Sequence, residues 1–476
     1  MSAQKKLDNA SLTKTQLKDN IHLMGISGIG MKGLLHILLN LNYSVSGSDL
    51  YLDKQLTSLI NEKNLFASHH PSHIHKDIQT LIYSAAIPTL NCELQEAKKK
   101  GILCLSRGDA LAQIATLAKT CIAISGTHGK TTTAACISHL LKQADYDPGY
   151  YIGGIPQNNF PQAYFNHNKF FVVETDESDG SFLNIPASIN AIINIDNDHL
   201  SYYTHFHHLL AAFETKIKQC IQKENTLIIN CNNKYLNELC QKNKAPIFSV
   251  GYHSQADLSA KNITFTKQGL NMDLFLHGHF QENISCPLYG EHNIENILIS
   301  IAIALQVGLS ISEIKIGLST FLGTKKRFEF LKNDQPIILD YAHHPTAIKA
   351  TLKAYKKHFD TPICAIFQPH RYSRLNDYFD DFVDALSLAE SLCILPVFSA
   401  QETDAYPLNH THLIAALKQK PNCTNILNSI EELFQNQRKK TSPLLFMGAG
   451  DIDQFAYDYV KKHQHQTTLS SIKPTY

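Results

Sequence analysis

The sequence predicts an α/β protein that is built from open, mostly parallel sheets. Short apolar runs alternate with segments of helical periodicity, which is the pattern of repeated βαβ units. Two apolar runs end in glycine-rich loops before a helix, and several others end in clusters of polar residues. Because open parallel sheets bind ligands at the carboxyl ends of their strands, these loops are the candidate binding sites. A chain of 476 residues has room for about three domains.

The composition is that of a globular protein with full hydrophobic cores. Hydrophobic residues make up 43% of the chain and charged residues 18%, and the formal net charge is +1. No block of like charges stands out, so we expect no nucleic-acid partner. The 11 cysteines are scattered and contain no C-x-x-C pair, which favours reduced thiols and a cytoplasmic protein. Residues 1–20 are polar and predict a loose tail, and no apolar run approaches the ~20 residues that span a bilayer, so we expect no membrane partner.

The first glycine-rich loop follows a predicted strand over residues 21–24. Gly28, Gly30 and Gly33 fit G-x-G-x-x-G, a helix is predicted over 34–41, and a second strand over 43–46 leads to Asp49. In this βαβ fingerprint the glycines let a pyrophosphate approach the backbone and the acid binds ribose hydroxyls. The fingerprint does not specify nicotinamide, since a UDP-sugar also carries a diphosphate and a ribose. A tight turn without a ligand is the structural alternative.

The second glycine-rich loop joins a predicted strand over 120–125 to a helix, and it reads Gly126-Thr127-His128-Gly129-Lys130-Thr131-Thr132. Backbone N–H groups and the helix dipole converge there, which suits a polyphosphate. We expect Lys130 to lie in a solvent-facing loop and reach the outer phosphates, and Thr131 to ligate Mg²⁺. This loop has two residues between its glycines where the common P-loop has four. The alternative is a structural turn, but the strand–loop–helix context favours a nucleotide triphosphate site.

Two further predicted strands end in candidate metal ligands. The runs over 170–173 and 189–195 lead into Glu174-Thr175-Asp176-Glu177-Ser178-Asp179 and Asp196-Asn197-Asp198-His199. Carboxylates at strand ends beside a P-loop are placed to hold Mg²⁺. A solvated acidic loop and a structural histidine are the alternatives. Alternation over 256–286 then predicts antiparallel strands.

A long apolar helix opens with Asn293 and Asn296, which share one face and could also be plain capping residues. Two later strands, over 337–339 and 363–367, end in Asp340-Tyr341-Ala342-His343-His344-Pro345-Thr346 and Gln368-Pro369-His370-Arg371-Tyr372-Ser373-Arg374. Further strands are predicted over 392–395 and 444–447, so the last section forms another open parallel sheet. The histidines and arginines at its strand ends are either a cationic binding set or ordinary surface-loop residues.

Together these motifs resemble those of the Mur ligases, from about residue 21 to residue 454. The ordered series is G-I-x-G-x-G-M, G-T-H-G-K-T-T, E-x-D-E-S-D, D-H, G-x-H-N-x-x-N, K-R-F, D-Y-x-H-H-P-T and F-Q-P-H-R-Y-S-R. The resemblance implies a three-domain Mur ligase-like α/β architecture. A flexible tail (1–20) would precede a Rossmann-like UDP-sugar-binding domain (21–118), a central P-loop ATPase domain (119–325) and a C-terminal Rossmann-like domain (326–476) that binds the amino acid and part of ATP.

The resemblance also implies an activity. It is the ATP-dependent addition of L-alanine to the lactyl carboxylate of UDP-N-acetylmuramate, with ATP and Mg²⁺ as cofactors, in peptidoglycan precursor synthesis and hence in cell-wall biogenesis, cell shape and cell division. Catalytic and metal roles fall on Lys130, Thr131, Glu174, His199 and Arg327. ATP contacts fall on Gly126, Thr127, His128, Gly129, Lys130, Thr131, Thr132, Asn293, Asn296, Arg327 and Asp340. UDP-sugar contacts fall on Gly28, Ile29, Gly30 and Asp49, and muramoyl and alanine contacts on His344, His370, Arg371 and Arg374.

The chain departs from the family pattern in three places. Ser27 stands where relatives often have glycine, and Ala342 stands where D-Y-G-H-H-P is usual, so Ala342 would be strained if its φ were positive. Lys216 lies on a helix that carries a carbamylated lysine in several Mur ligases, but its register does not match, so it receives no such role.

Three other functions compete with this interpretation. A murein peptide ligase of wall recycling would share the motifs of the first two domains but should lack F-Q-P-H-R-Y-S-R. An NAD-dependent oxidoreductase built on the first glycine-rich loop leaves the P-loop unexplained. A non-catalytic nucleotide sensor would need neither metal-binding carboxylates nor a third domain of cationic loops. Relaxed choice of amino acid, the general base and the oligomeric state stay open.

Overall fold

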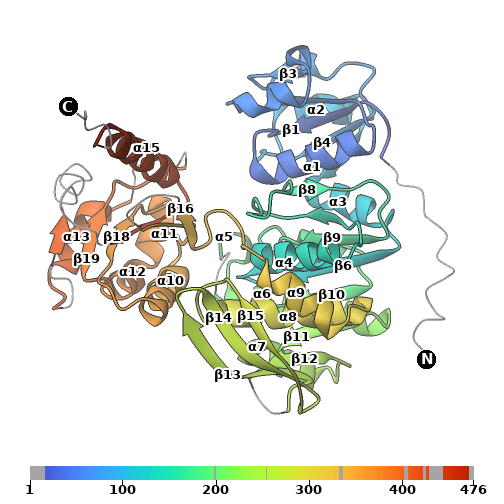
Figure 1. Cartoon of the computed structure of the whole chain (residues 1–476). Helices are drawn as coiled ribbons and strands as arrows, with labels where there is room; N and C mark the ends of the chain where they lie inside the picture. Colours follow the sequence, from blue (N-terminus) through green and yellow to red (C-terminus); the bar gives the residue numbers. More distant parts are fainter. Residues whose placement is uncertain are drawn as a thin grey trace, which may run out of the picture. The chain divides into compact units, whose positions relative to one another are not determined.

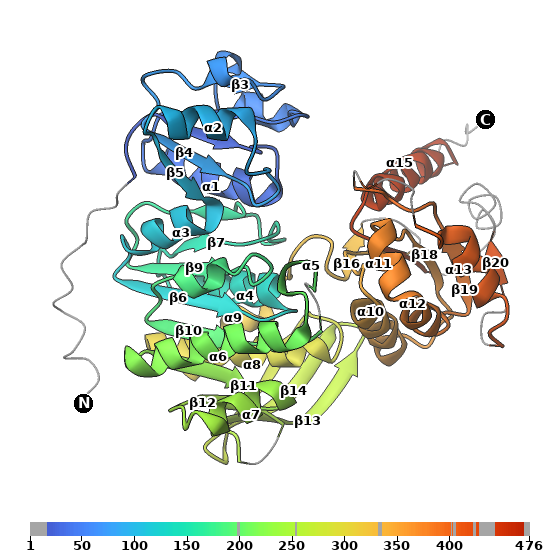
Figure 2. The ribbon, with the colours of Figure 1, turned by 180° about the vertical axis from the view of Figure 1, so that it is seen from behind.

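The computed structural model describes residues 17–197, 200–252, 255–331, 336–400, 402, 406–421, 425–427 and 443–470. Its strands form three sheets, which Figures 1 and 2 show from opposite sides. The chain divides into two compact units. Unit 1 comprises Met1–Asn262, Met272–Ser285 and Ile294–Leu322, and unit 2 comprises Ile263–Asn271, Cys286–Asn293 and Gly323–Tyr476.

The first sheet, in unit 1, is parallel and has the order β3-β2-β1-β4-β5. Strands β2 and β3 lie on one side of β1, and β4 and β5 lie on its other side. The loop after β1 is therefore at the topological switch point, where such sheets bind ligands. The strands are β1 (Ile21–Met24), β2 (Val45–Ser48), β3 (Leu65–Phe66), β4 (Thr80–Tyr83) and β5 (Leu103–Ser106). The helices are α1 (Ile29–Asn40), α2 (Cys92–Lys99) and α3 (Arg107–Ala115), with short 3₁₀ turns η1 (Lys54–Ser58), η2 (Glu62–Asn64) and η3 (Pro71–His73).

The central sheet has the order β15-β14-β13-β12-β11-β10-β6-β9-β7-β8. Its middle strands β10, β6, β9 and β7 pair in parallel, and the chain switches sides at β6, directly before the second glycine-rich loop. The strands are β6 (Thr120–Ser125), β7 (Gly149–Tyr151), β8 (Ala163–Tyr164), β9 (Phe170–Glu174), β10 (Ile189–Ile192), β11 (Thr226–Asn230), β12 (Phe248–Gly251), β13 (Leu258–Thr266), β14 (Gly269–Leu276) and β15 (His279–Cys286). The helices are α4 (Lys130–Gln143), α5 (Leu200–Tyr203), α6 (Phe206–Gln222), α7 (Lys234–Lys242), α8 (His292–Val307) and α9 (Ile311–Ser319), with the 3₁₀ turn η4 (Ser181–Asn184).

One hydrophobic core joins the first sheet to the central sheet. Helices α1 and α3 lie between the two sheets (Figure 1), and their apolar faces pack against both. The core contains Leu23 of β1 and Leu34 of α1 together with Ala123 of β6 and Phe171 of β9, each of them at most 1% exposed. Helix α2 covers the opposite face of the first sheet, where Leu94 packs with residues of β1 and β4.

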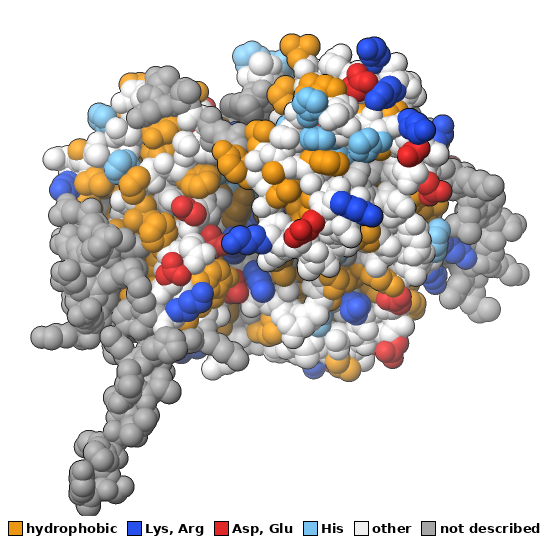
Figure 3. Space-filling model, turned by 90° about the horizontal axis from the view of Figure 1, so that it is seen from above, with side chains coloured by type: hydrophobic (Ala, Val, Ile, Leu, Met, Phe, Trp, Pro, Cys, Tyr) orange, Lys and Arg blue, Asp and Glu red, His pale blue; other side chains and the backbone are white. Residues whose placement is uncertain are grey.

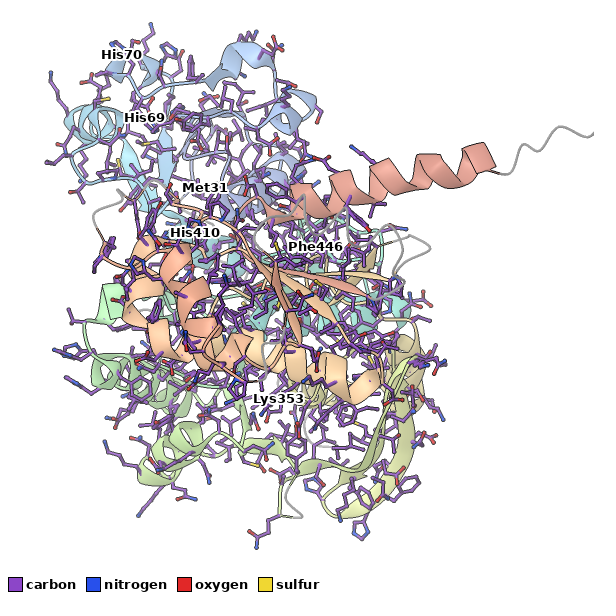
Figure 4. All side chains as sticks on the ribbon, turned by 90° about the vertical axis from the view of Figure 1, so that its left-hand side faces the viewer. Met31, His69, His70, Lys353, His410 and Phe446 are labelled. Atoms are coloured by element: carbon purple, nitrogen blue, oxygen red, sulfur yellow. The ribbon has the colours of Figure 1, made fainter. Side chains whose placement is uncertain are left out.

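The third sheet, in unit 2, has the order β16-β17-β21-β18-β19-β20, and all of its neighbouring strands except β16 and β17 pair in parallel. Figure 4 labels Phe446, which is fully buried in a central strand of this sheet, and Lys353 on the helix that follows β17. The strands are β16 (Glu329–Leu331), β17 (Ile337–Asp340), β18 (Cys364–Phe367), β19 (Ser391–Ile394), β20 (Asn425–Leu427) and β21 (Leu444–Met447). The helices are α10 (Pro345–His358), α11 (Tyr372–Asp377), α12 (Phe379–Leu386), α13 (His410–Leu417) and α15 (Ile452–Ser470).

The α/β fold predicted from the sequence is confirmed, and three predicted elements are corrected. Helix α1 begins at Ile29 and not at residue 34, so the glycine-rich loop includes the first turn of the helix. The second strand is Val45–Ser48 and not 43–46, because its register against β1 extends to Ser48. Strand β10 ends at Ile192 and not at residue 195, because the chain then turns towards the neighbouring P-loop.

On the face seen in Figure 3, acidic and basic side chains are interspersed. No helix within the described ranges is both long and apolar enough to cross a bilayer. The cysteines in the described part of the chain form no disulfide.

Candidate active site

The second glycine-rich loop connects β6 to α4 and depends on two glycines with positive φ. Gly126 has φ 132° and Gly129 has φ 85°, a region that other residues rarely adopt. Space excludes a side chain as well, since a Cβ on Gly129 would lie 2.1 Å from Oδ1 of Asn296 and a Cβ on Gly126 would lie 3.0 Å from the backbone of Asn194. The loop is therefore a tightly packed turn at a helix N-terminus, the geometry that binds phosphate.

Asn194 holds the second glycine-rich loop in place through hydrogen bonds. Its side chain accepts a hydrogen bond from the His128 N–H at 2.8 Å and donates one to the His128 carbonyl at 3.1 Å. The Thr127 N–H donates to the Asn194 carbonyl, and the Thr127 hydroxyl accepts from the Asp196 N–H at 2.9 Å. Sequence reasoning missed Asn194 because it counted this residue within a strand.

Lys130 lies folded back over the loop. Its ammonium donates to both carboxylate oxygens of Glu177 at 2.6 and 2.8 Å and to the carbonyl of Gly126 at 2.6 Å. The expectation of a solvent-facing lysine is wrong, since the Lys130 side chain is only 14% exposed and that of Glu177 is fully buried. Burial alone would lower the pKa of Lys130, but the nearby carboxylates, Glu177 foremost, outweigh it and raise that pKa. A phosphate ligand must therefore compete with Glu177 for this ammonium.

Thr131 and Glu174 form an oxygen-rich pair at the adjacent strand end. The Thr131 hydroxyl donates to Glu174 Oε1 at 2.9 Å, and Glu174 Oε2 accepts the Gly153 N–H at 2.6 Å. Thr132 is the next residue of the helix and is buried. His199 lies outside the described residues, and among those described no three His, Cys, Asp or Glu side chains converge to hold a metal ion. A hydroxyl and a carboxylate nevertheless fit Mg²⁺, which takes hard oxygen ligands and keeps several waters.

Asn293 and Asn296 both lie at the start of α8. Asn293 is buried and its side-chain amide donates to the Tyr289 carbonyl at 2.7 Å. Asn296 is also buried and accepts from the Thr133 hydroxyl at 3.4 Å, directly against the P-loop glycine. The structure thus brings Asn296 to the phosphate loop, and its predicted contact with ATP stays a prediction.

The first glycine-rich loop lies at the N-terminus of α1. Gly28 is the N-cap residue of this helix, and Ile29 is 53% exposed beside it. Asp49 follows β2, and its carboxylate accepts the Ser27 N–H at 3.0 Å. Asp49 therefore stabilises the first glycine-rich loop through a hydrogen bond, and its contact with a ribose stays a prediction. Ser27, the residue that departs from the family pattern, donates from its hydroxyl to the Tyr51 carbonyl at 2.7 Å.

In unit 2, Arg327 and Asp340 lie in neighbouring segments. The Asp340 carboxylate accepts the N–H groups of Phe328 and Ala342, each at 2.8 Å, and the Arg327 guanidinium lies 5.1 Å from the centroid of the Tyr341 ring. Burial raises the pKa of Asp340, and Arg327 opposes the rise. Ala342 is not among the residues with positive φ, so the alanine at this position carries no strain of that kind.

The cationic set of unit 2 gathers at the carboxyl ends of β17 and β18. His344 is the N-cap of α10, and its ring packs edge-on against Tyr378. Nη1 of Arg374 lies 3.3 Å from Nδ1 of His370, whose ring stacks on Phe398. Arg371 has φ 71° and ψ 135°, a backbone conformation that non-glycine residues rarely adopt and that clusters at functional sites.

Two histidines of this set are neutral near pH 7. Burial, together with the positive charge of Arg374, lowers the pKa of His343 to about 3 and that of His370 to about 4. The two rings lie 5.9 Å apart. The arginines therefore supply the fixed positive charge of the cluster, and the imidazoles supply neutral hydrogen-bonding groups.

A P-loop lysine beside strand-end carboxylates is the arrangement of an enzyme that depends on a nucleoside triphosphate. The chain belongs to the Mur ligase family. Three family models match it, namely "Mur ligase family, catalytic domain" over residues 20–119, "Mur ligase middle domain" over 124–304 and "Mur ligase, glutamate ligase domain" over 326–450. Mur ligases are ATP-dependent enzymes, and that the P-loop holds the ATP phosphates stays a prediction.

Curated relatives match the chain almost from end to end. It is 37% identical over 447 residues to the UDP-N-acetylmuramate–L-alanine ligase of Hydrogenobaculum sp. (strain Y04AAS1), which covers 92% of this chain and 98% of that protein. It is 34% identical over 456 residues to the protein of the same name from Clostridium acetobutylicum, which covers 94% and 99%.

Solved structures share the fold. The UDP-N-acetylmuramate-alanine ligase of Thermotoga maritima superposes with a TM-score of 0.79 at 23% identity, over 94% of this chain and all of that one. A murein peptide ligase from Psychrobacter arcticus 273-4 superposes with a TM-score of 0.65 at 21% identity, over 96% of this chain and all of that one.

Proposed function

We propose that this protein joins L-alanine to the lactyl carboxylate of UDP-N-acetylmuramate and releases ADP and phosphate, as a step of peptidoglycan precursor synthesis. The end-to-end match to curated ligases of that name carries the proposal. The site supports it, since the chain has a phosphate loop with a lysine, a second loop suited to a diphosphate, and a cationic cluster suited to carboxylates.

The chemistry requires activation of a carboxylate, because a carboxylate alone has no good leaving group. Transfer of the γ-phosphoryl group of ATP to the lactyl carboxylate gives an acyl phosphate and ADP. The alanine amine then attacks the acyl carbon, and the tetrahedral oxyanion collapses to the amide and inorganic phosphate. Charge on the migrating phosphoryl group needs preorganised cations, and Lys130 and Arg327 are the residues we assign to it.

Lys130 performs this task by exchanging partners. Its ammonium is held by Glu177 and by the Gly126 carbonyl beside the N-terminus of α4, which is where we assign the phosphates. Thr131 and Glu174 would hold Mg²⁺, with His199 as a further ligand, and the bound ion would neutralise phosphate charge. We assign the remaining ATP contacts to Asn293, Asn296 and Asp340, and the sugar-nucleotide contacts to Gly28, Ile29, Gly30 and Asp49.

The alanine and muramoyl groups are assigned to His344, His370, Arg371 and Arg374. An amino acid brings a carboxylate, which the arginines can bind, and an amine that reacts only without its extra proton. The neutral imidazoles of His343 and His370 add no positive charge that would repel the ammonium form. ATP as co-substrate and the free thiols favour the cytoplasm. We propose domain boundaries at residues 118/119 and 325/326.

A phosphate-release assay tests the proposal. The purified chain is given ATP, Mg²⁺ and UDP-N-acetylmuramate with L-alanine, glycine, L-serine or the tripeptide L-alanyl-γ-D-glutamyl-meso-diaminopimelate, which appears in the name of a structural neighbour from Neisseria meningitides. We expect the highest kcat/KM with L-alanine. Turnover with the tripeptide and not with L-alanine would assign the chain to wall recycling, and no turnover with any amine would refute the ligase function.

A further inference from the structure

Arg107 is a partly buried cation that neither the motifs nor the proposed mechanism uses. It is the first residue of α3, and its side chain is 20% exposed. Nη2 donates to Oδ2 of Asp176 at 2.7 Å and lies 3.7 Å from Oδ2 of Asp179. Both carboxylates belong to the acidic loop that also carries Glu177, the partner of Lys130. One end of the guanidinium is thus bound to the loop beside the phosphate site.

The other end of the guanidinium lies against the first glycine-rich loop. A Cβ on Gly30 would lie 2.4 Å from Nη1 of Arg107 and 2.9 Å from the Tyr151 hydroxyl. The Tyr151 hydroxyl donates to the Gly30 carbonyl at 3.0 Å. A side chain at position 30 would therefore displace the guanidinium of Arg107 from the place that it occupies in this structure.

The first turn of α3 is held rigidly in this place. A Cβ on Gly108 would lie 2.2 Å from Cβ of Ser181, so the helix packs directly on η4. The Asn184 amide donates to Oδ1 of Asp109 at 3.0 Å, and the Ser106 hydroxyl caps the helix by accepting the Asp109 N–H. Arg107 therefore leaves a fixed backbone, and its two ends reach the two loops without rearrangement of the helix.

The negative charges on both sides of Arg107 explain why a cation is needed between the acidic loop and the first glycine-rich loop. Burial by itself would lower the pKa of Arg107, but the hydroxyl of Tyr151 and the carboxylates of Asp176 and Asp179 outweigh it and raise that pKa. A diphosphate on the Gly28–Gly30 loop would bring further negative charge towards the same carboxylates. Without Arg107, the ligand and Asp176 would repel each other across a partly dehydrated gap. A planar guanidinium can bind an anion at each end, which a lysine ammonium does less well.

We propose that Arg107 binds the diphosphate of the sugar nucleotide with the end that faces Gly30 and, through Asp176, couples occupancy of that loop to the acidic loop beside Lys130. This inference rests on the proposed function, because it takes the ligand of the first loop to be a nucleoside diphosphate. Arg107 is a binding residue in this role, and Asp176 is a positioning residue.

Calorimetric titration with UDP, UMP and uridine tests the binding half. We expect Arg107→Ala and Arg107→Lys to bind UDP about ten- to a hundredfold more weakly than the parent, the loss of a charge-assisted hydrogen-bond pair. Uridine, which has no phosphate, should bind all variants alike. Lys99→Ala removes an exposed positive charge from the same part of the chain and should bind UDP as the parent does. Arg107→Lys keeps the charge and much of the packing, so it answers the question even if Arg107→Ala unfolds.

The coupling half is tested by the affinity for a non-hydrolysable ATP analogue, measured with and without saturating UDP. UDP should tighten analogue binding in the parent, and this effect should be lost in Asp176→Asn while UDP affinity stays within about threefold. UDP affinity unchanged in both Arg107 variants would overturn the inference and leave the proposed function intact. Equal weakening of UDP and uridine would also overturn it, because Arg107 would then only support the fold. A parent protein that binds no UDP would refute the proposed function itself.

Discussion

Replacement of Lys130 by alanine should damage both catalysis and stability. The side chain of Glu177 is fully buried and Lys130 holds both of its carboxylate oxygens, at 2.6 and 2.8 Å. Lys130→Ala removes the ammonium that contacts both oxygens of this buried carboxylate, and breaking a buried ion pair costs about 3–5 kcal/mol. For a chain of 476 residues the entropy of unfolding is about 1 kcal/mol/K, so this loss corresponds to a fall in Tm of about 3–5 °C. Turnover should fall about 10²–10³-fold, because one preorganised charge is missing from the phosphoryl transition state.

A second substitution separates the two effects. Glu177→Gln in the Lys130→Ala background removes the buried negative charge and should recover most of the lost Tm, as measured by differential scanning calorimetry. Turnover should stay low in this double variant, because the amide cannot replace an ammonium at the phosphates. A parent-like Tm in Lys130→Ala would refute the buried ion pair as a stabilising contact. Recovery of turnover in the double variant would remove Lys130 from the mechanism.

Three further predictions concern other parts of the molecule. Arg371→Gly should lose activity without a fall in Tm, because glycine adopts the backbone conformation at φ 71° without strain. Arg374→Gly, in helix α11, should instead lose about 1 kcal/mol of stability. Equal losses of stability in the two variants, measured by calorimetry, would contradict this prediction. Lys216→Met should raise Tm at pH 7, because burial lowers the pKa of Lys216, whose ammonium has one hydrogen bond to Ile185 at 3.3 Å. The pKa of Lys216 is lower in the folded than in the unfolded protein, so the parent protein gains stability as the pH rises from the folded towards the unfolded pKa. The Tm difference between Lys216→Met and the parent should therefore shrink towards pH 10. A Tm difference that does not change with pH would show that the charge of Lys216 is not its cause. ¹⁸O in the lactyl carboxylate should appear in inorganic phosphate after one turnover, with ADP as the other product, and mass spectrometry that finds the label in AMP would assign the chain to adenylation.

Local sequence signals predicted the strands that lead to the sites. The prediction of β6 over 120–125 matches the structure to the residue, because six buried residues end at a glycine that can take positive φ. The strand 444–447 was predicted equally well, since its four apolar residues are all buried. Such elements are determined by burial and by the turn residue that follows, and both are visible in a short window of sequence.

The contacts that complete the sites were not predictable in the same way. The burial of Lys130 depends on Glu177, which lies 47 residues further along the chain. Asn194 and Arg107 act through loops that only the folded sheets bring together, and neither belongs to a known short motif. Asn194 sits within an apolar run, and Arg107 opens an ordinary amphipathic helix. Long-range pairing of this kind has no periodicity, so pattern reasoning along the chain does not detect it.

The core shared by the first two sheets has a consequence for how the chain can be divided. Helices α1 and α3 present apolar faces both to β1 and to the central sheet, so a fragment ending near residue 118 would expose side chains of the core that α1 and α3 share with the central sheet. Such a fragment would expose an apolar surface and would therefore be prone to aggregate. Fragments for ligand screening, and fusions that exchange the sugar-nucleotide part between homologues, should therefore keep residues 17–322 together, so that the first two sheets fold as one cooperative block.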